Sequence, residues 1–292
     1  MAFPPRKFMI MGEAGVGKTS LLATFPQPIL SFHFDNPDKA EEPYERLGDY
    51  ERDPKTGLYL RPNPGILGPI VNSDEGRYRW VTSRRTNKKI ILIRFYKDID
   101  PRDPRGWVDF HNYHTKLVHG GLYRADGTLR WNTIGYDSVG GMEFLARKDQ
   151  QYRMNADAKD SRQWYGGSTD ELEEFLQSSV PALPCNAVVI THIDHREDPI
   201  HGGFLHMPVA PGRLRINLFR DYSEMYRFYV AKDEEGTHRR LQTAASGEFH
   251  AFTQIGAPDG CKPTYRSLWV NWAKTHKEEK NSGEFVEGQR VS

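Results

Sequence analysis

The sequence has little cysteine, no long apolar run and almost no net charge. Its two cysteines, Cys185 and Cys261, are too few for a disulfide framework and lack the spacing of a metal or redox motif. No apolar run approaches the roughly 20 residues that span a bilayer, and the N-terminal residues do not resemble a signal peptide. A formal charge of +1 gives no strong overall attraction to nucleic acid. We therefore expect a cytoplasmic protein without a membrane partner.

What the chain does have is the composition of a globular α/β protein. Its 292 residues are 37% hydrophobic and 27% charged, which is enough to bury a substantial core. Apolar runs typical of buried strands alternate with segments of helical periodicity, and this predicts a mostly parallel central sheet covered by helices. The core strands are predicted at residues 7–11, 29–34, 131–136 and 187–191. The helices are predicted at residues 19–24, 107–118 and 142–153, and from a capping box at 168–171 onward.

Two regions depart from this alternation. Residues 43–105 are rich in Pro, Gly, Arg and Asp, and we interpret them as an inserted, β-rich elaboration. From Lys274 onward the chain is polar and charged, which predicts disorder. The sequence thus predicts one domain over residues 1–273 and a disordered tail over 274–292. Hairpins are predicted at residues 78–83 with 90–95 and at residues 225–231 with 238–243.

Residues 12–19 read Gly-Glu-Ala-Gly-Val-Gly-Lys-Thr and match the phosphate-binding P-loop pattern at every fixed position. The match lies between a predicted apolar strand and a predicted helix, which is the context that the motif requires. Its glycines let backbone N–H groups point at phosphate oxygens, Lys18 reaches the β- and γ-phosphates, and the Thr19 hydroxyl binds Mg²⁺. We expect ATP and Mg²⁺ as ligands. The predicted nucleotide-binding residues are Gly12, Glu13, Ala14, Gly15, Val16, Gly17, Lys18, Thr19 and Ser20.

A carboxylate at the end of a neighbouring strand is the second element that a P-loop site needs for its metal. Asp137 follows the strand predicted at 131–136 and precedes Ser138. Its strand is less apolar than usual, with Gly135 where a large side chain is expected. We interpret Asp137 and Thr19 as the metal residues. The alternative is an ordinary aspartate that caps the following helix.

Two further polar side chains are predicted at the same edge of the sheet. His192 follows the strand at 187–191, at the edge where open α/β sheets bind ligands, and could sense the γ-phosphate. A solvated loop histidine is the open alternative. Asp35 follows the strand at 29–34 and could orient the attacking water as general base, with Glu41 and Glu42 as rivals. The predicted catalytic set is therefore Lys18, Asp35, Asp137 and His192.

The order of these motifs resembles the RecA-like ATPases, and in particular the short phage-encoded RecA-like ATPases that accompany single-strand annealing and recombination. The likeness is carried by the P-loop at 12–19, the acidic strand end at Asp35, the pair Asp137-Ser138, the pair Thr191-His192, and a late hairpin followed by Leu241-Gln242-Thr243. It covers roughly residues 7–40 and 130–245.

The resemblance implies a RecA-like fold, ATP hydrolysis with Mg²⁺, association into rings or filaments, and contact with single-stranded DNA. It also implies a single-strand-binding protein as a further partner and, for a phage protein, the host cytoplasm as location. The sequence departs from the family pattern in two places. Residues 43–105 have no counterpart, and Asn36-Pro37 follows Asp35 where the family has a catalytic glutamate. Efficient hydrolysis is therefore in doubt.

The resemblance also points to regions that contact DNA or a neighbouring subunit. Family DNA-binding loops correspond to residues near 161–165 and within 195–215, where aromatic rings beside arginines suit base stacking and phosphate contact. Arg239 and Arg240 on the late hairpin could reach a neighbouring subunit's γ-phosphate as a trans-acting finger. For both regions the open alternative is an ordinary solvated surface. The candidate DNA-binding residues are Arg162, Trp164, Tyr165, Arg196, Arg213 and Arg215.

The sequence therefore favours a Mg-dependent RecA-like protein that binds and hydrolyses ATP and acts on single-stranded DNA in phage recombination, annealing or repair. One alternative is a P-loop phosphotransferase for a small molecule, with Arg84-Arg85 supplying a lid. Another is a nucleotide-switched binding module with little turnover. A GTPase is disfavoured, because Thr86-Asn87-Lys88-Lys89 lacks the aspartate that recognises guanine.

Overall fold

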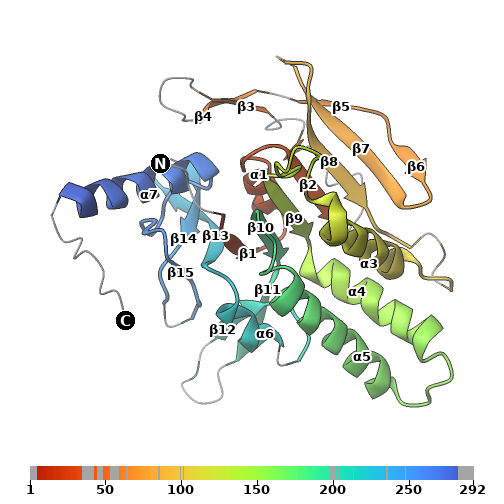
Figure 1. Ribbon diagram of the computed structural model, residues 1–292. Coiled ribbons are helices and arrows are strands. Elements are labelled where there is room, and N and C mark those ends of the chain that lie inside the picture. Colours follow the sequence, from red (N-terminus) through yellow and green to blue (C-terminus); the bar gives the residue numbers. More distant parts are fainter. Residues whose placement is uncertain are drawn as a thin grey trace, which may run out of the picture.

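The fold is an α/β arrangement around one large sheet (Figure 1). The strands are β1 (Lys7–Gly12), β2 (Ile29–His33), β3 (Asp49–Arg52), β4 (Tyr59–Asn63), β5 (Gly65–Leu67), β6 (Val71–Ser73), β7 (Gly76–Ser83), β8 (Lys89–Phe95), β9 (Thr133–Asp137), β10 (Asn186–Thr191), β11 (Ile193–Glu197), β12 (Phe204–Pro208), β13 (Glu224–Asp233), β14 (Gly236–Gln242) and β15 (Phe252–Thr253). The helices are α1 (Lys18–Leu22), α3 (Gly106–Lys116), α4 (Val139–Asp149), α5 (Ser161–Glu174), α6 (Leu214–Asn217) and α7 (Tyr265–Asn281). In this computed structural model the described residues are 5–34, 43–44, 49–52, 59–63, 65–84, 86–98, 100, 102–197, 202, 204–212, 214–234, 236–246 and 248–281.

The central sheet has a parallel core with antiparallel edges. Its strands follow the order β14-β13-β1-β10-β9-β2-β8-β7-β5, and those from β13 to β8 run parallel to one another. The carboxyl ends of β1, β9 and β10 therefore meet at one edge of the sheet. This is the edge at which open α/β sheets bind ligands. The predicted fold class, a mostly parallel sheet covered by helices, is confirmed.

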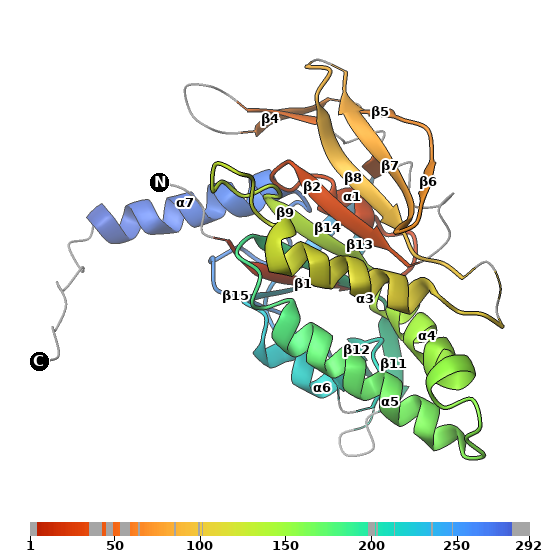
Figure 2. The same cartoon turned by 45° about the vertical axis from the view of Figure 1, so that its right-hand side comes forward.

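Both faces of the sheet are covered, because successive side chains of each core strand point to opposite sides. Along β1, Phe8 and Ile10 join a core with α1 and α7, whereas Met9 and Met11 join a core with α3, α4 and α5. In Figures 1 and 2 these last three helices form one layer in front of the sheet. The unbroken apolar run of β10 is buried throughout, as a strand covered on both faces requires.

Residues 43–105 contribute directly to the central sheet. The hairpin predicted within them is confirmed as β7 and β8, and β8 pairs parallel with β2. Strands β5 and β6 then pair with β7, while β3 and β4 form a separate antiparallel pair. The second predicted hairpin is confirmed as β13 and β14, with its turn between Asp233 and Gly236. The central sheet therefore has more strands than the four core strands predicted from the sequence, because β8 and the strands beyond it continue the sheet past β2.

Several predicted boundaries were wrong. Helix α5 begins at Ser161, where the Asp160 side chain accepts a hydrogen bond from the Arg162 backbone N–H, so the capping box predicted at Ser168 lies inside the helix. Ser168 instead donates from Oγ to the carbonyl of Tyr165. Helix α4 begins at Val139, earlier than predicted, and α7 continues to Asn281, past the predicted start of the disordered tail. Residues 282–292 lie outside the described residues.

Three helices of the front layer end in wider, π-helical turns, at Leu117–Gly121, Gln150–Met154 and Phe175–Ser179. Among the residues that the structure describes, no helix is both long and apolar enough to cross a membrane.

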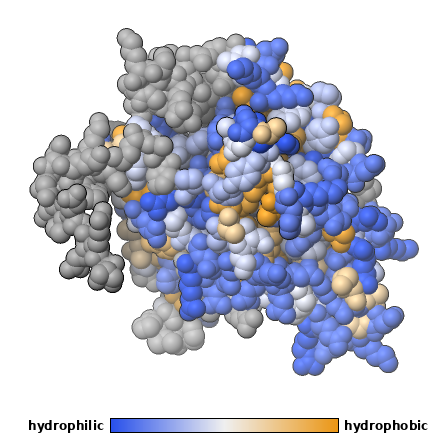
Figure 3. Space-filling view, in the orientation of Figure 1, coloured by the Kyte–Doolittle hydropathy of each residue, from blue (hydrophilic) through white to orange (hydrophobic). Residues whose placement is uncertain are grey.

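On the face seen in Figure 3, hydrophilic residues predominate and apolar ones gather near its middle. Both cysteines are buried and free.

Candidate nucleotide site

The P-loop runs from the end of β1 to the start of α1. A β-carbon on Gly12 would lie 2.6 Å from the carbonyl oxygen of Phe228, so only glycine fits beside strand β13 there. Gly15 and Gly17 have φ angles of 77° and 109°, in the left-handed region that favours glycine. The backbone therefore needs all three glycines of the motif. Strand, loop and helix follow one another as the sequence predicted.

Lys18 is buried, and its ammonium group is held by the loop that it follows. Its Nζ donates to the carbonyl oxygens of Gly12 and Glu13 at 2.7 and 2.8 Å, and it lies 3.3 Å from Nδ1 of His192. The contact joins the P-loop to the end of β10, two segments far apart in the sequence. The ammonium group thus lies between the loop and the predicted sensor.

Asp137 stands at the carboxyl end of β9, beside the first turn of α1. Thr19 donates a hydrogen bond from Oγ1 to Asp137 Oδ2 at 2.5 Å. The cap of α4 is Ser138, whose Oγ accepts from the Gly141 N–H at 3.4 Å, so the capping role that competed for Asp137 belongs to its neighbour. A hydroxyl and a carboxylate in contact form a donor set that suits Mg²⁺ with a triphosphate.

A buried polar network lies behind Asp137. His33, at the end of β2, has Nδ1 4.0 Å from Asp137 Oδ2 and Nε2 3.0 Å from the Tyr44 hydroxyl. Ser31 completes the network at 2.7 Å from the same hydroxyl. Burial raises the pKa of Tyr44 well above its usual range, so its hydroxyl stays protonated. The sequence did not predict this network. Its one signal is the polar pair Ser31 and His33 within an apolar strand.

Gly135, which makes the strand before Asp137 less apolar than usual, is required by the close packing of helix α1 on that strand. A β-carbon on Gly135 would lie 2.4 Å from Cδ2 of Leu22 in α1. Helix α1 therefore packs directly on β9, which brings Thr19 within reach of Asp137. Helix α4 is close in a similar way, since a β-carbon on Gly141 would lie 2.7 Å from Cβ of Phe34.

His192, predicted to sense the γ-phosphate, follows the end of β10. Thr191 donates from Oγ1 to the carbonyl of Val209 at 3.0 Å, and the Val209 N–H donates to the carbonyl of His192 at 2.8 Å. These bonds fix the backbone that carries His192. The His192 side chain also lines a cavity of about 460 Å³ that Ser138 shares. The cavity is further lined by Phe34, Lys97, Phe144 and Lys148.

Glu13 connects the P-loop to the β11–β12 hairpin. Its Oε1 lies 2.8 Å from Nε2 of His195, and Nδ1 of His195 lies 2.6 Å from Nδ1 of His206. His206 stacks on Phe249 with ring centroids 4.1 Å apart. Burial and the neighbouring His195 lower the pKa of His206, which favours its neutral form. Within the described part of the chain, no group of three or more His, Cys, Asp and Glu side chains is arranged to hold a metal ion.

Arg239, predicted to reach a neighbouring subunit, lies beside the P-loop of its own chain. A β-carbon on Gly17 would be 3.7 Å from both Cδ and Cζ of Arg239. Phe228, on the paired strand, lies 3.4 Å from the same position. The Arg240 side chain instead donates to the carbonyl of Arg239. The sequence did not distinguish the two arginines, but in the structure it is the Arg239 side chain that lies beside the P-loop.

The residues predicted to contact DNA do not form one loop. Arg162, Trp164 and Tyr165 lie in the first turns of α5, which corrects the predicted loop there. Arg162 pairs with Asp160, and Trp164 donates from Nε1 to the carbonyl of Asn155 at 3.0 Å. Of the two aromatic residues, Tyr165 is the more exposed, at 51%, and Arg147 lies over its ring at 5.3 Å.

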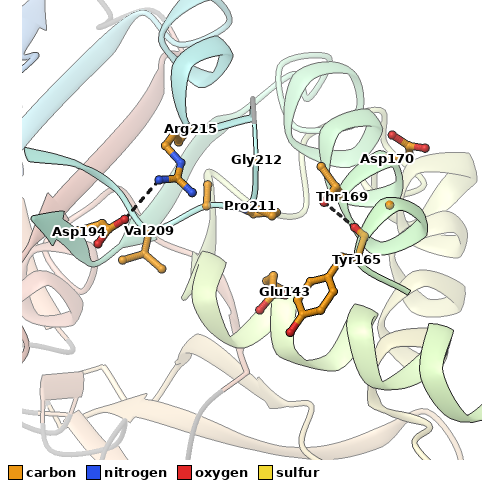
Figure 4. A pocket seen from close by; sticks show the side chains of 11 residues that line it. Glu143, Tyr165, Thr169, Asp170, Asp194, Val209, Pro211, Gly212 and Arg215 are labelled. Atoms are coloured by element: carbon orange, nitrogen blue, oxygen red, sulfur yellow. Dashed lines mark hydrogen bonds and ion pairs between the residues drawn. The ribbon is translucent and has the colours of Figure 1, made fainter. Parts of the chain in front are cut away.

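The second predicted segment is largely the β11–β12 hairpin. Arg196 and Arg215 both pair with Asp194, at 2.9 and 3.3 Å. Arg215 and Tyr165 line a cavity of about 710 Å³ between this segment and helix α5. Figure 4 shows Arg215 reaching toward Asp194 on one side of the cavity, with Tyr165 on the other. Arg213 and the predicted base Asp35 lie outside the described residues.

No protein-family model matches the chain, and no curated protein matches it in sequence. Solved structures do match. A KaiC-like protein from the hyperthermophilic archaeon Pyrococcus horikoshii OT3 has a TM-score of 0.41 at 12% identity, over 87% of this chain and 85% of that chain. The flagellar accessory protein FlaH from Methanocaldococcus jannaschii has a TM-score of 0.35 at 8% identity, over 86% and 80%.

A third similar structure is an ATPase from the type III secretion system of pathogenic bacteria. Its TM-score is 0.38 at 13% identity, over 77% of this chain and 52% of that chain.

Proposed function

We propose that this chain is a Mg-dependent, RecA-like ATPase that acts on single-stranded DNA in recombination, annealing or repair. The observation that carries the nucleotide part is the contact of Thr19 with Asp137 beside an intact P-loop. The DNA part rests on the resemblance of the motif order. Assembly into a ring or filament is part of the same proposal.

Each residue of the site has a defined role in this proposal. Lys18 leaves the carbonyl oxygens of Gly12 and Glu13, which hold it in the free protein, and transfers its hydrogen bonds to the phosphates. Thr19 and Asp137 hold Mg²⁺, whose charge offsets that of the β- and γ-phosphates. His192 lies next to Lys18 and reports whether the γ-phosphate is present. Asp35, after β2, orients the attacking water.

The test is ATP hydrolysis with and without single-stranded DNA, comparing the wild type with Lys18→Ala. We expect Mg-dependent phosphate release that DNA stimulates and that the variant loses. Asp126→Asn, an exchange on an exposed turn far from the loop, serves as a control and should leave the rate unchanged. A wild type that neither hydrolyses ATP nor binds DNA would contradict the proposal.

A second candidate is a phosphotransferase for a small anionic molecule. It is favoured by the cavity of about 460 Å³ that shares Ser138 and His192 with the site and carries Lys97 and Lys148. Arg84, one of the two arginines that could form a lid over the acceptor, is exposed beside the β7–β8 turn. Transfer of labelled γ-phosphate from ATP to a metabolite, without net phosphate release, would favour this candidate over hydrolysis.

A further inference from the structure

Helix α4, the π-helical turn that follows it, and helix α5 expose three aromatic rings. Phe144 is 47% exposed, Tyr152 39% and Tyr165 51%. Phe144 and Tyr152 are eight positions apart along α4 and its π-helical turn, so they lie on one side of the helix. The core side of the same helix is different: Met142, Leu145 and Ala146 are almost fully buried there.

Two cations lie between these rings. Arg147 has its Cζ 5.7 Å from the ring centroid of Phe144 and 5.3 Å from that of Tyr165. Lys148 has its Nζ 5.8 Å from the centroid of Phe144 and 5.0 Å from that of Tyr152. Rings and positive charges therefore alternate across a continuous surface. We call these five residues the aromatic–cationic strip: Phe144, Arg147, Lys148, Tyr152 and Tyr165.

The strip is not explained by the stability of the fold. Large rings that pack in a core lose nearly all their exposure, as Phe175 and Tyr136 do here. The rings of the strip keep between 39% and 51% of theirs. Its charges are also only partly offset, because Arg147 is paired with Glu143 at 3.0 Å whereas Lys148 contacts the neutral Gln151 at 3.3 Å.

Alternating rings and cations match the chemistry of single-stranded nucleic acid. Its bases offer flat faces that stack on aromatic rings, and its phosphates lie at intervals that lysine and arginine can contact. A duplex hides its base faces, and a lipid surface would require a broad apolar helix face separated from the charges, whereas here Arg147 and Lys148 lie between the rings. We propose that the strip binds single-stranded nucleic acid, with bases stacked on Phe144, Tyr152 and Tyr165. This inference deepens the function proposed above and rests on it.

The strip also leads to the nucleotide site. Phe144 and Lys148 belong to the wall of the 460 Å³ cavity that contains His192, and His192 lies 3.3 Å from Lys18 Nζ. At its other end, Tyr165 borders the 710 Å³ cavity, whose Val209 is hydrogen-bonded to the His192 backbone. A strand on the strip thus borders the cavity that His192 lines, and His192 in turn contacts the P-loop lysine. This is a route by which bound nucleic acid changes the rate of hydrolysis.

The test measures binding of a fluorescent oligothymidylate and a matched oligouridylate by anisotropy, with the full-length chain. Phe144→Ala and Tyr165→Ala should each weaken binding about tenfold or more, because each removes one stacking platform. Tyr123→Ala, which removes an equally exposed ring outside the strip, should bind like the wild type. The two oligomers show whether the strip prefers DNA or RNA.

Salt dependence tests the cations separately. Lys148→Gln should lower the slope of log affinity against log salt concentration by about 0.7, the value for one lost phosphate contact with a single strand. Tyr165→Phe keeps the ring and should bind normally, which separates stacking from misfolding. If the wild type binds but all the strip variants bind equally well, this inference is wrong and the proposed function stands. If the wild type binds neither oligomer, both the strip and the DNA part of the proposed function fail.

Discussion

Thr19 and Asp137 are 118 positions apart in the chain, yet the Thr19 hydroxyl donates to the Asp137 carboxylate at 2.5 Å. The contact depends on β9 and α1 packing together, and it joins the two residues that we propose as the Mg²⁺ site. The proposed site thus combines a local motif with an aspartate from a distant strand.

Asp137→Asn tests that donor set with minimal change of shape. The amide can still accept from Thr19, but the negative charge is lost, so Mg-dependent hydrolysis should fall on the order of a hundredfold or more. The measurement is phosphate release at saturating ATP and Mg²⁺, with circular dichroism as the check on folding. Retained activity would remove Asp137 from the metal site.

The Gly135 contact predicts a stability effect away from any chemistry. Gly135→Ala places a methyl group against Leu22, whose Cδ2 lies 2.4 Å from that position, so the buried Leu22 side chain or helix α1 must shift. We expect a loss of about 1–3 kcal/mol in the free energy of unfolding. Urea denaturation measures it.

A matched glycine gives the opposite expectation. Gly166 lies inside α5, and a β-carbon there meets nothing within 4 Å. Gly166→Ala should raise the free energy of unfolding by about 0.5–1 kcal/mol, through helix propensity alone. Equal effects at the two glycines would mean that Gly135 is not required for close packing.

Stability should fall as the pH drops below about 6.5, and His114 is one cause. It is buried against Tyr136, and burial, followed by the nearby His111, lowers its pKa to about 4. Between these values the unfolded chain takes up a proton that the folded chain does not, so acid favours unfolding. His114 should lower the free energy of unfolding by on the order of 3 kcal/mol once the pH has fallen below both of its pKa values, unfolded and folded.

Urea midpoints across that pH range should show the effect, and His114→Gln should flatten it. His111 acts in the same direction, because burial also lowers its pKa. The double variant is therefore expected to have the shallowest pH dependence. An unchanged slope in His114→Gln would assign the acid sensitivity to other groups.

Local patterns predicted the core of the site, and long-range packing produced the rest. The P-loop, the strand that precedes it and the position of Asp137 at a strand end could be predicted, because each depends on neighbours in the sequence. The network of Ser31, His33 and Tyr44 could not, because the tyrosine reaches β2 from another segment. The same holds for β8, whose place beside β2 is a choice of partner that strand patterns do not encode.

Helix α5 shows how a local pattern can mislead. Ser168 and Glu171 have the spacing of a capping box, yet both lie inside α5. Gly167 instead lets α5 approach Gln150, whose Oε1 would lie 2.5 Å from a β-carbon there. Glycine suits both a flexible loop and the close packing of two helices, and only the tertiary contact shows which of the two roles Gly167 has. Residues 161–165, predicted as a DNA-binding loop, therefore form the first turns of helix α5.

Arg239 offers a test of whether its charge acts within one chain or between chains. Among the described residues no carboxylate pairs with it, and its side chain lies 3.7 Å from the position of a β-carbon on Gly17 of the same chain. We therefore expect Arg239→Ala to weaken hydrolysis from within its own site. Mixing Arg239→Ala with Lys18→Ala should then restore nothing, because each chain still lacks one group. A finger acting between chains would instead regain activity wherever an intact Lys18 meets an intact Arg239. Arg240→Ala, whose side chain turns back to its own strand, is the matched control and should hydrolyse ATP like the wild type.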